Sequence, residues 1–386
     1  MVLSVLLINC SAAPMTALAR EPAPGEFGAL VYDPWLNGFP YRKSHVINAA
    51  SGAGTNYQVK ITVHYGAGTD SGADVYLNSH GRTDFGDVRF TGSDGVTQLS
   101  CWMEAYTSGD KATFWVKVTD DLSSTARTIY LYYGNSVVTT TSNGDNTFLF
   151  FDDFPGSSLD TTTKWTITYG TPLVENGYVK FQGVERIRSK STFGTNTSLR
   201  IRHKIITSGS DIVWGMDSAT PQQSIWFRDA PAVSEDVTRT YVTAWEIINV
   251  PAYDLTERIY DILRNSSTNV IFIKDGSTIA THTVRVPSES LYIVNSSDSS
   301  DEAWWDWCFI RKFISPEPAH GSWGSEDVLI TQAGSAASWN WKVPAVDGTE
   351  KVRSGSATNW SWVTFQNDGT GITVPRGTAT SWQWGP

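Results

Sequence analysis

The sequence predicts an all-β protein: two β-sandwich (jelly-roll) domains followed by a short Trp-rich β-hairpin repeat tail. Only 18% of the 386 residues are charged, and Gly, Ser, Thr, Asn and aromatic residues are plentiful. Short segments alternate polar and apolar residues, and turn-forming Gly, Asn and Asp separate them. Near the C-terminus, one Trp-x-Trp phrase occurs three times. Such a composition and such alternation favour strands over long helices.

The N-terminal residues are predicted to direct export. Residues 1–19 contain the apolar run Val2–Ile8 and end in the small-x-small pattern Ala17–Ala19, which is typical of a secretory signal peptide. A mis-assigned start codon is the alternative, because no basic residue precedes the apolar run. Residues 20–34 are rich in Pro and Gly and are predicted to be a linker. We therefore expect an extracellular or cell-surface protein.

Charge and hydropathy exclude two kinds of partner. The net charge is −10 and the chain has no basic run, so nucleic acid is not expected to bind. No stretch approaches the roughly 20 apolar residues that a membrane-spanning helix needs.

The first sandwich is predicted over residues 35–140. Four segments alternate as half-buried strands do: Gln58–Tyr65, Asp87–Phe90, Ala112–Val118 and Thr128–Tyr133. Turn residues such as Ser93-Asp94-Gly95 lie between them. Several strands at this spacing indicate a sandwich, and residues 136–146, rich in Thr and Ser, are expected to link it to the next domain.

Four motifs in this region resemble those of a domain of unknown function found in archaeal and bacterial surface proteins. They are Trp35–Lys43, Tyr65–Gly72, Thr83–Phe90 and Tyr132–Asn135, and they cover about residues 31–140. The resemblance implies a fold and a surface context. That family has no established activity, so the resemblance implies no reaction.

The second jelly roll is predicted over residues 147–326. Its first segment, Phe148–Asp160, and its last, Trp304–Lys312, resemble the ends of concanavalin-like, laminin-G-type jelly rolls, in which the first and last strands pair. Strand-like segments fill the region between them, including Leu199–Ile205, Ser224–Phe227 and Asn269–Ile273.

Laminarinase-type hydrolases share this jelly roll and hold a structural calcium ion between its first and last strands. That resemblance implies Asp153 and Asp306 as metal ligands, with backbone oxygen from near Gly177. Calcium takes six to eight oxygen ligands, so carbonyls and water would complete the shell. The alternative is that these acids cap turns or pair with Arg311 and Lys312.

Catalysis by such a hydrolase needs two carboxylates that face each other across a sugar. In the laminarinase-type family they come from a Glu-x-Asp-x-x-Glu strand, and this sequence has no such strand. Trp214, Trp226 and Trp245 lie in predicted central strands, where indole rings stack on sugar rings. Each of these three residues is a candidate for carbohydrate binding, and core packing is the alternative for each.

The tail is predicted over residues 327–386. Its three phrases begin at Gly334, Gly355 and Gly377, which are 21 and then 22 residues apart. Such a period marks units that stack on their neighbours. Asp347-Gly348 and Asp368-Gly369 suit hairpin turns, so each repeat is expected to be one hairpin. A stacked core, contact with a partner subunit and an aromatic ladder for glycan all remain open for the tryptophans.

These features predict an exported, non-catalytic protein that binds a polysaccharide or surface glycan, or acts in adhesion. One alternative is a polysaccharide-degrading enzyme of the concanavalin-like fold. The other is a structural subunit of an extracellular or viral fibre, with self-assembly through the C-terminal repeats.

Overall fold

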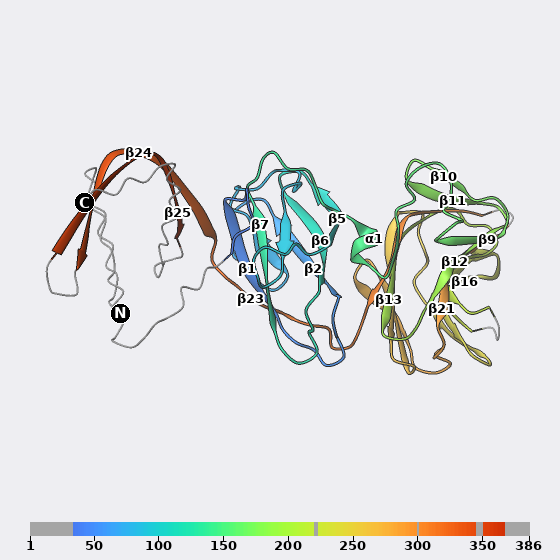
Figure 1. The fold of residues 1–386 in the computed structure, drawn as a ribbon. Helices are drawn as coiled ribbons and strands as arrows, with labels where there is room; N and C mark the ends of the chain where they lie inside the picture. Colours follow the sequence, from blue (N-terminus) through green and yellow to red (C-terminus); the bar gives the residue numbers. More distant parts are fainter. Residues whose placement is uncertain (1–33, 220–222, 299–300, 345–349, 367–386) are drawn as a thin grey trace.

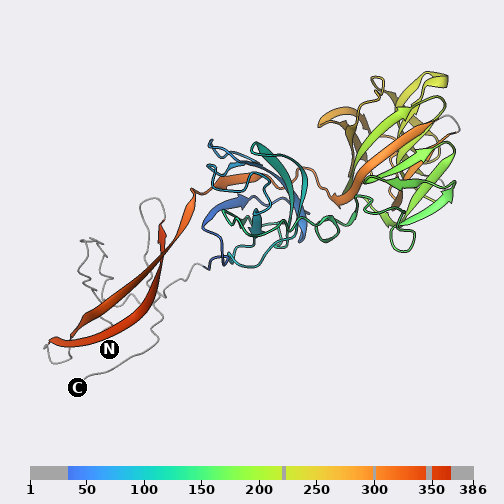
Figure 2. The ribbon, with the colours of Figure 1, turned by 90° about the horizontal axis from the view of Figure 1, so that it is seen from above.

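The computed structural model describes residues 34–219, 223–298, 301–344 and 350–366, with the backbone alone from residue 330 onward. Residues 1–33, which include the predicted signal peptide, lie outside these ranges, and so does the third repeat. The regular elements of the described chain are almost all strands, which confirms the all-β prediction. Figure 2 shows the repeat strands, a first sandwich and a second sandwich in a row.

The first sandwich consists of two sheets. One has the order β3 (Asp74–Tyr76), β2 (Tyr57–His64), β6 (Lys111–Val118) and β5 (Cys101–Thr107). The other contains β1 (Tyr41–Ile47), β7 (Arg127–Tyr133) and β4 (Arg89–Thr91). Alternation along β2 buries Val59, Ile61 and Val63 and leaves Lys60 exposed. The apolar faces of the two sheets therefore form the first core.

The chain returns to this sandwich after the second one. Strand β23 (His320–Trp323) and the start of β24 (Asp327–Pro344) both pair with β1. The ring of Trp323 stacks on His45 with centroids 3.7 Å apart, and His45 Nε2 lies 2.8 Å from His320 Nδ1. The second sandwich is thus an insertion between β7 and β23. The predicted range 147–326 was too long, since it includes a strand of the first sandwich.

The second sandwich is built from two large sheets. The first has the order β10 (Leu173–Glu175), β11 (Tyr178–Gln182), β22 (Glu302–Lys312), β13 (Thr197–Thr207), β18 (Arg258–Asn265), β19 (Asn269–Lys274) and β20 (Ser277–His282), and β8 (Phe150–Asp152) also pairs with β22. We call it the eight-stranded sheet. The pairing of β8 with β22 confirms that the first and last strands of this domain meet.

The other sheet of this sandwich, which we call the seven-stranded sheet, carries the site described below. Its order is β17 (Trp245–Asn249), β16 (Glu235–Tyr241), β15 (Ser224–Ala230), β14 (Ile212–Asp217), β21 (Leu291–Ser297), β12 (Glu185–Phe193) and β9 (Trp165–Tyr169). The inner faces of the two sheets enclose one continuous apolar core.

An aromatic cluster joins the two sandwiches. It lies between β5 and β6 of the first sandwich and β22 of the second, beside the short helix α1 (Gly144–Thr147). We call these residues the junction cluster: Trp102, Trp115, Phe148, Phe151, Trp307 and Phe309. Beside them, Arg200 forms ion pairs at 3.2 Å with Glu104 of the first sandwich and with Asp261. The eight-stranded sheet therefore faces the first sandwich (Figure 1).

In the tail, β24 and β25 (Glu350–Gln366) form one long antiparallel pair. The first repeat lies in β24 and the second in β25, so a repeat supplies one strand and the expectation of one hairpin per repeat was wrong. The predicted turn at Asp347-Gly348 lies outside the described residues.

Candidate functional site

The outer face of the seven-stranded sheet is the candidate functional site. The eight-stranded sheet lies between this face and the first sandwich, so the face points away from the junction (Figure 1). Strand alternation places Trp226 of β15 and Arg239 of β16 opposite each other there, and it places Tyr241 opposite Trp245.

The aromatic rings on this face contact one another. The centroids of Trp226 and Trp245 are 5.2 Å apart with planes tilted by 44°, and those of Tyr241 and Trp245 are 4.7 Å apart. Trp245 lies on the edge strand β17 and is 37% exposed, whereas Trp226 is half-buried. Two of the three predicted carbohydrate-binding residues are therefore brought together, and one of them presents a ring to solvent.

Arginine side chains border these rings. The Arg239 guanidinium lies 5.3 Å from the centre of the Trp245 ring and is also paired with Glu235. Further along the sheet, the Arg188 guanidinium lies 5.1 Å from the Tyr292 ring. Burial and the nearby Arg228 lower the pKa of Arg239 from its usual high value. We call Trp226, Arg239, Tyr241 and Trp245 the aromatic platform.

A glycine borders the platform for a steric reason. Gly215 lies opposite Trp226, and a Cβ at this position would come within 2.3 Å of the Ile225 carbonyl oxygen. Its φ of +149° also falls where side chains are disfavoured. One flank of Trp226 across the sheet therefore carries no side chain.

Trp214, the third predicted binding residue, does not belong to this face. It is completely buried, stacks on Phe227 with centroids 5.4 Å apart, and lies 4.4 Å from the ring of His203. Residues 212, 214 and 216 of β14 point into the core, while the register pairs Trp226 with Gly215. Trp214 and Trp226 therefore lie on opposite faces of the sheet, and the binding prediction for Trp214 was wrong.

The carboxylates on the outer face are bound to arginines. Asp217 accepts a hydrogen bond of 2.9 Å from Arg188, and Arg228 pairs with both Asp211 and Glu235. Burial raises the pKa of Asp217, and Arg188 opposes this shift. The cross-strand neighbours of Asp217 are Ser224 and Tyr292, so no second carboxylate adjoins it across the sheet. Hydrolysis of a glycosidic bond by two carboxylates is not supported at this position.

One close pair of carboxylates does exist in the same sheet. Asp229 and Asp236 are paired across β15 and β16, and burial together with the hydrogen bond from Asp236 raises the pKa of Asp229 to about 6. Asp229 is opposite Ile212 in the register and is only 5% exposed, which places it on the core side. A polysaccharide on the outer face would not reach this pair.

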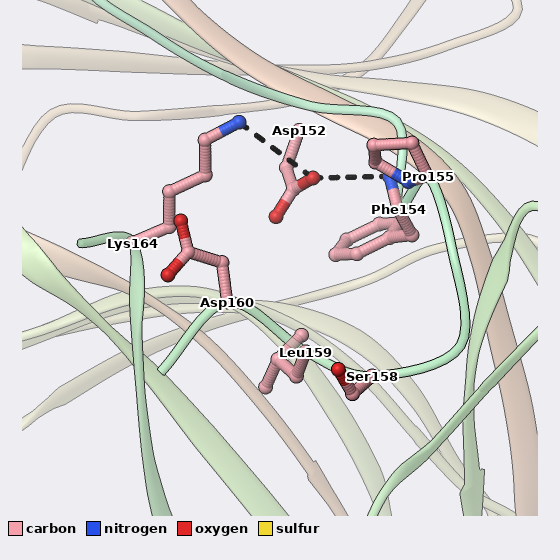
Figure 3. A pocket seen from close by; sticks show the side chains of 7 residues that line it. All are labelled: Asp152, Phe154, Pro155, Ser158, Leu159, Asp160 and Lys164. Carbon is pink, nitrogen blue, oxygen red and sulfur yellow. Dashed lines mark hydrogen bonds and ion pairs between the residues drawn. The ribbon is translucent and has the colours of Figure 1, made fainter. Parts of the chain in front are cut away.

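A small cavity of about 100 Å³ lies at the start of the second sandwich (Figure 3). Its acids already have structural partners: Asp152 accepts hydrogen bonds from Phe154 N and Trp165 Nε1, and Asp160 accepts from Thr162 N and Thr163 N. Drug-sized ligands occupy pockets of about 300–1,000 Å³. This cavity is therefore too small for a sugar, and its carboxylates already have hydrogen-bond partners within the protein.

The two predicted calcium ligands lie near the outer face of the eight-stranded sheet. The Asp306 carboxylate is 3.2 Å from Arg202 Nη1, and Arg202 also pairs with Glu257. Burial raises the pKa of Asp306 to about 6, with further contributions from Glu257 and Asp153 and an opposing one from Arg202. Among the described residues, no group of three or more His, Cys, Asp or Glu side chains is arranged to hold a metal ion. Because Arg202 already supplies positive charge at Asp306, these residues do not fit calcium well.

Sequence reasoning did not find Arg239, Tyr241, Arg188 or Tyr292. The signal available for Arg239 and Tyr241 was their spacing of two residues, which places both on one face of a strand. Which face this would be depends on the register of β16 against β15, and the residue pattern alone does not give that register.

Comparison with known proteins gives a partial family match. A domain of unknown function, DUF2341, matches residues 84–168. The match includes the motif Thr83–Phe90 except for its first residue, includes Tyr132–Asn135, and continues across the junction into β9. It does not include Trp35–Lys43 or Tyr65–Gly72, so it is shifted from the predicted stretch of 31–140. No curated protein matches the chain.

Several solved structures are similar to part of the chain. An uncharacterised protein from Mycobacterium paratuberculosis is 14% identical over 42% of this chain and 100% of its own, with a TM-score of 0.38. A β-1,3-glucanase from Mycobacterium marinum is 15% identical over 42% and 98%, with a TM-score of 0.36. A pseudo β-1,3-glucanase of Mycobacterium tuberculosis is 14% identical over 44% and 99%, with a TM-score of 0.38. Likeness at this level gives no information on what this chain binds.

No helix among the described residues is long and apolar enough to cross a membrane.

Proposed function

We propose that this chain is an extracellular, non-catalytic glycan-binding protein and that its aromatic platform contacts the sugar. The observation that carries the proposal is the partly exposed Trp245 ring, held against Trp226 and Tyr241 on a sheet face that points away from the junction. The C–H face of a pyranose stacks on such a surface, and adjacent N–H groups bind its hydroxyls. Arg239 supplies such groups beside the rings.

The electrostatics of the face support binding rather than hydrolysis. Each of Asp211, Asp217 and Glu235 forms an ion pair with an arginine. A glycosidase needs one carboxyl group held protonated opposite a second that is ionised. Burial raises the pKa of Asp217, as a general acid requires, but its cross-strand neighbours are Ser224 and Tyr292, and neither is a carboxylate.

A glycan-array screen of the full chain, followed by titration of any glycan that binds, tests this proposal. Trp245→Ala should weaken binding about tenfold, which corresponds to about 1.4 kcal/mol. Tyr169→Ala is the matched control, because Tyr169 is an aromatic residue with 62% exposure at the opposite edge of the same sheet. Equal affinity of wild type and Trp245→Ala would refute the platform as the binding site.

The non-catalytic part has its own test. Incubation of the protein with each bound glycan should release no new reducing ends. If ends are released, and Asp217→Asn abolishes the release, the protein is an enzyme and Asp217 is its acid.

A further inference from the structure

Arginine residues lie in rows that cross the strands on the outer face of the seven-stranded sheet. The register sets residues of successive strands opposite one another, and we call one such line of residues the central row. From β16 to β12 it contains Arg239, Trp226, Gly215, Val294 and Arg188. Its two arginines are four strands apart, which is about 19 Å between their backbones.

Positive charge exceeds negative charge around this row. Arg228 and Arg186 lie in the row on one side of it, and Asp217 lies in the row on the other side. The acids Asp211 and Glu235, which pair with Arg228, lie beyond the ends of these rows. Even with them, the four arginines outnumber the three carboxylates, although the chain as a whole has a net charge of −10. This face therefore differs in sign from the rest of the protein.

The arginines of the central row have few protein partners for their N–H groups. A guanidinium has five N–H donors. Nη2 of Arg188 donates to Asp217 and Nη2 of Arg239 donates to Glu235, whereas the Nε–H of each arginine has no acceptor among the described residues. The same is true of Trp226 Nε1. Since a buried donor without an acceptor is costly, the row favours a ligand that is rich in acceptor oxygens.

Arg186 adds a charge that no carboxylate of the described chain neutralises. Its side chain is exposed, and within the described residues it donates a hydrogen bond to Ser296 Oγ alone, at 3.3 Å. Arginine binds oxyanions such as carboxylates through two parallel N–H···O bonds, which are stronger than bonds between neutral groups. Anionic groups on a ligand are therefore the partners that this face fits best.

We propose, building on the glycan binding proposed above, that the ligand is an acidic polysaccharide that carries carboxylate or sulfate groups. It lies along the central row, across the strands. Trp226 and Trp245 contact its sugar rings, and Arg239 binds an acidic group beside them. Arg188 and Arg186 bind another acidic group at the far end of the row. Because the arginines of the row are about 19 Å apart, a single sugar unit does not reach both, and the ligand is a polymer.

Two matched pairs of polymers test this proposal with the full chain. Dextran sulfate is compared with dextran, and polygalacturonate with its methyl ester, so each pair shares a backbone and differs in charge. At about 0.15 M salt the charged member of at least one pair should bind about tenfold more tightly, and its affinity should fall as salt is added. Preference in either pair supports the proposal, and the pair that shows it identifies the acidic group as sulfate or carboxylate.

Single substitutions locate the binding of the charged polymer. Arg186→Gln should weaken it about tenfold, since a charge-assisted hydrogen bond is lost, and should leave any binding of the uncharged polymer unchanged. Arg188→Gln should weaken it at least as much. Because Arg188→Gln also removes the partner of Asp217, circular dichroism checks its fold, and Arg186→Gln decides the test if that variant is unfolded. Arg127→Gln is the matched control, because it removes the same charge from β7 of the first sandwich.

The outcomes separate the acidic ligand from the platform. Equal affinity for charged and uncharged polymers, with Trp245→Ala weakening both, would overturn the acidic ligand and leave the platform in place. Equal losses in Arg186→Gln and Arg127→Gln would also overturn it, because attraction would then come from the charge of the whole surface. Binding that depends on Arg186 and not on Trp245 would support the acidic ligand and refute the platform. No binding to either charged polymer or to any acidic glycan of the array would overturn the acidic ligand.

Discussion

The second sandwich has aromatic residues on both of its outer faces, and the two faces differ in what covers them. On the eight-stranded sheet, Trp307 and Phe309 are buried against Trp102 and Trp115 of the first sandwich. On the seven-stranded sheet, Trp245 remains 37% exposed and has arginine beside it. Similar aromatic residues are therefore buried where the fold supplies a partner surface and stay partly exposed where it does not. The junction cluster is expected to stabilise the fold, and the platform is expected to bind.

The largest expected effect is at the junction cluster. Trp307→Ala should lower the free energy of unfolding by about 3–5 kcal/mol, because it leaves a cavity among rings that contact it, including Trp102 at 5.3 Å. Trp245→Ala is the matched change on the other face and should cost less than about 1 kcal/mol. Urea unfolding followed by circular dichroism measures both. Similar losses for the two variants would contradict the proposed difference between the faces.

The next effect concerns charge at the junction. Arg200 is 13% exposed and lies between Glu104 and Asp261, which are 6% and 5% exposed. Arg200→Met leaves two buried carboxylates without this partner and should cost about 3 kcal/mol. Adding Glu104→Gln and Asp261→Asn to Arg200→Met should recover much of the loss in the same urea experiment. No recovery would indicate that the arginine acts through packing on Trp115 rather than through its charge.

The all-β class followed from local patterns, whereas the pairing of the first and last strands of the second sandwich followed from the resemblance to concanavalin-like jelly rolls. Phe150–Asp152 and Trp304–Lys312 are apolar runs at the two ends of one domain, and such runs indicate strands directly. The local patterns did not predict on which face of the sheet Trp214 and Trp226 lie, since a shift of one residue in register exchanges the two faces of a strand. The return of β23 to the first sandwich also did not follow. It depends on contacts between His45 and Trp323, which are 278 positions apart in the sequence.

A smaller effect depends on pH and concerns Asp306, which lies in the eight-stranded sheet. The folded pKa of Asp306 is about 6, above the unfolded value of about 3.9. The folded state therefore binds this proton more tightly, and the stability contributed by the group grows as the pH falls from about 7 to 4. Asp306→Asn should accordingly be more stable relative to wild type at pH 7.5 than at pH 4.5, by about 1 kcal/mol after allowance for solvent screening.

Comparison of the two proteins at each pH is needed for Asp306 because histidines oppose the trend. Burial lowers the pKa values of His45 and His203 to about 3, so these groups destabilise the fold as the pH falls below about 6.5. Both histidines are present in wild type and variant, and their contribution cancels in the difference. A difference between the two proteins that is constant with pH would show that Asp306 is not shifted.

The smallest expected effect is that of calcium. Asp306 is held by Arg202, which also binds Glu257, so a divalent ion at Asp153 and Asp306 would have to compete with a guanidinium already in place. Adding a chelator or millimolar calcium should therefore change the melting temperature by less than about 1 °C, whereas an ion at 100 times its Kd would contribute about 2.7 kcal/mol. A calcium-dependent rise that Asp153→Asn abolishes would restore the predicted metal site. It would also mean that Arg202 leaves Asp306 when the ion binds. The outer face of the eight-stranded sheet would then bind a ligand as well as pack against the first sandwich.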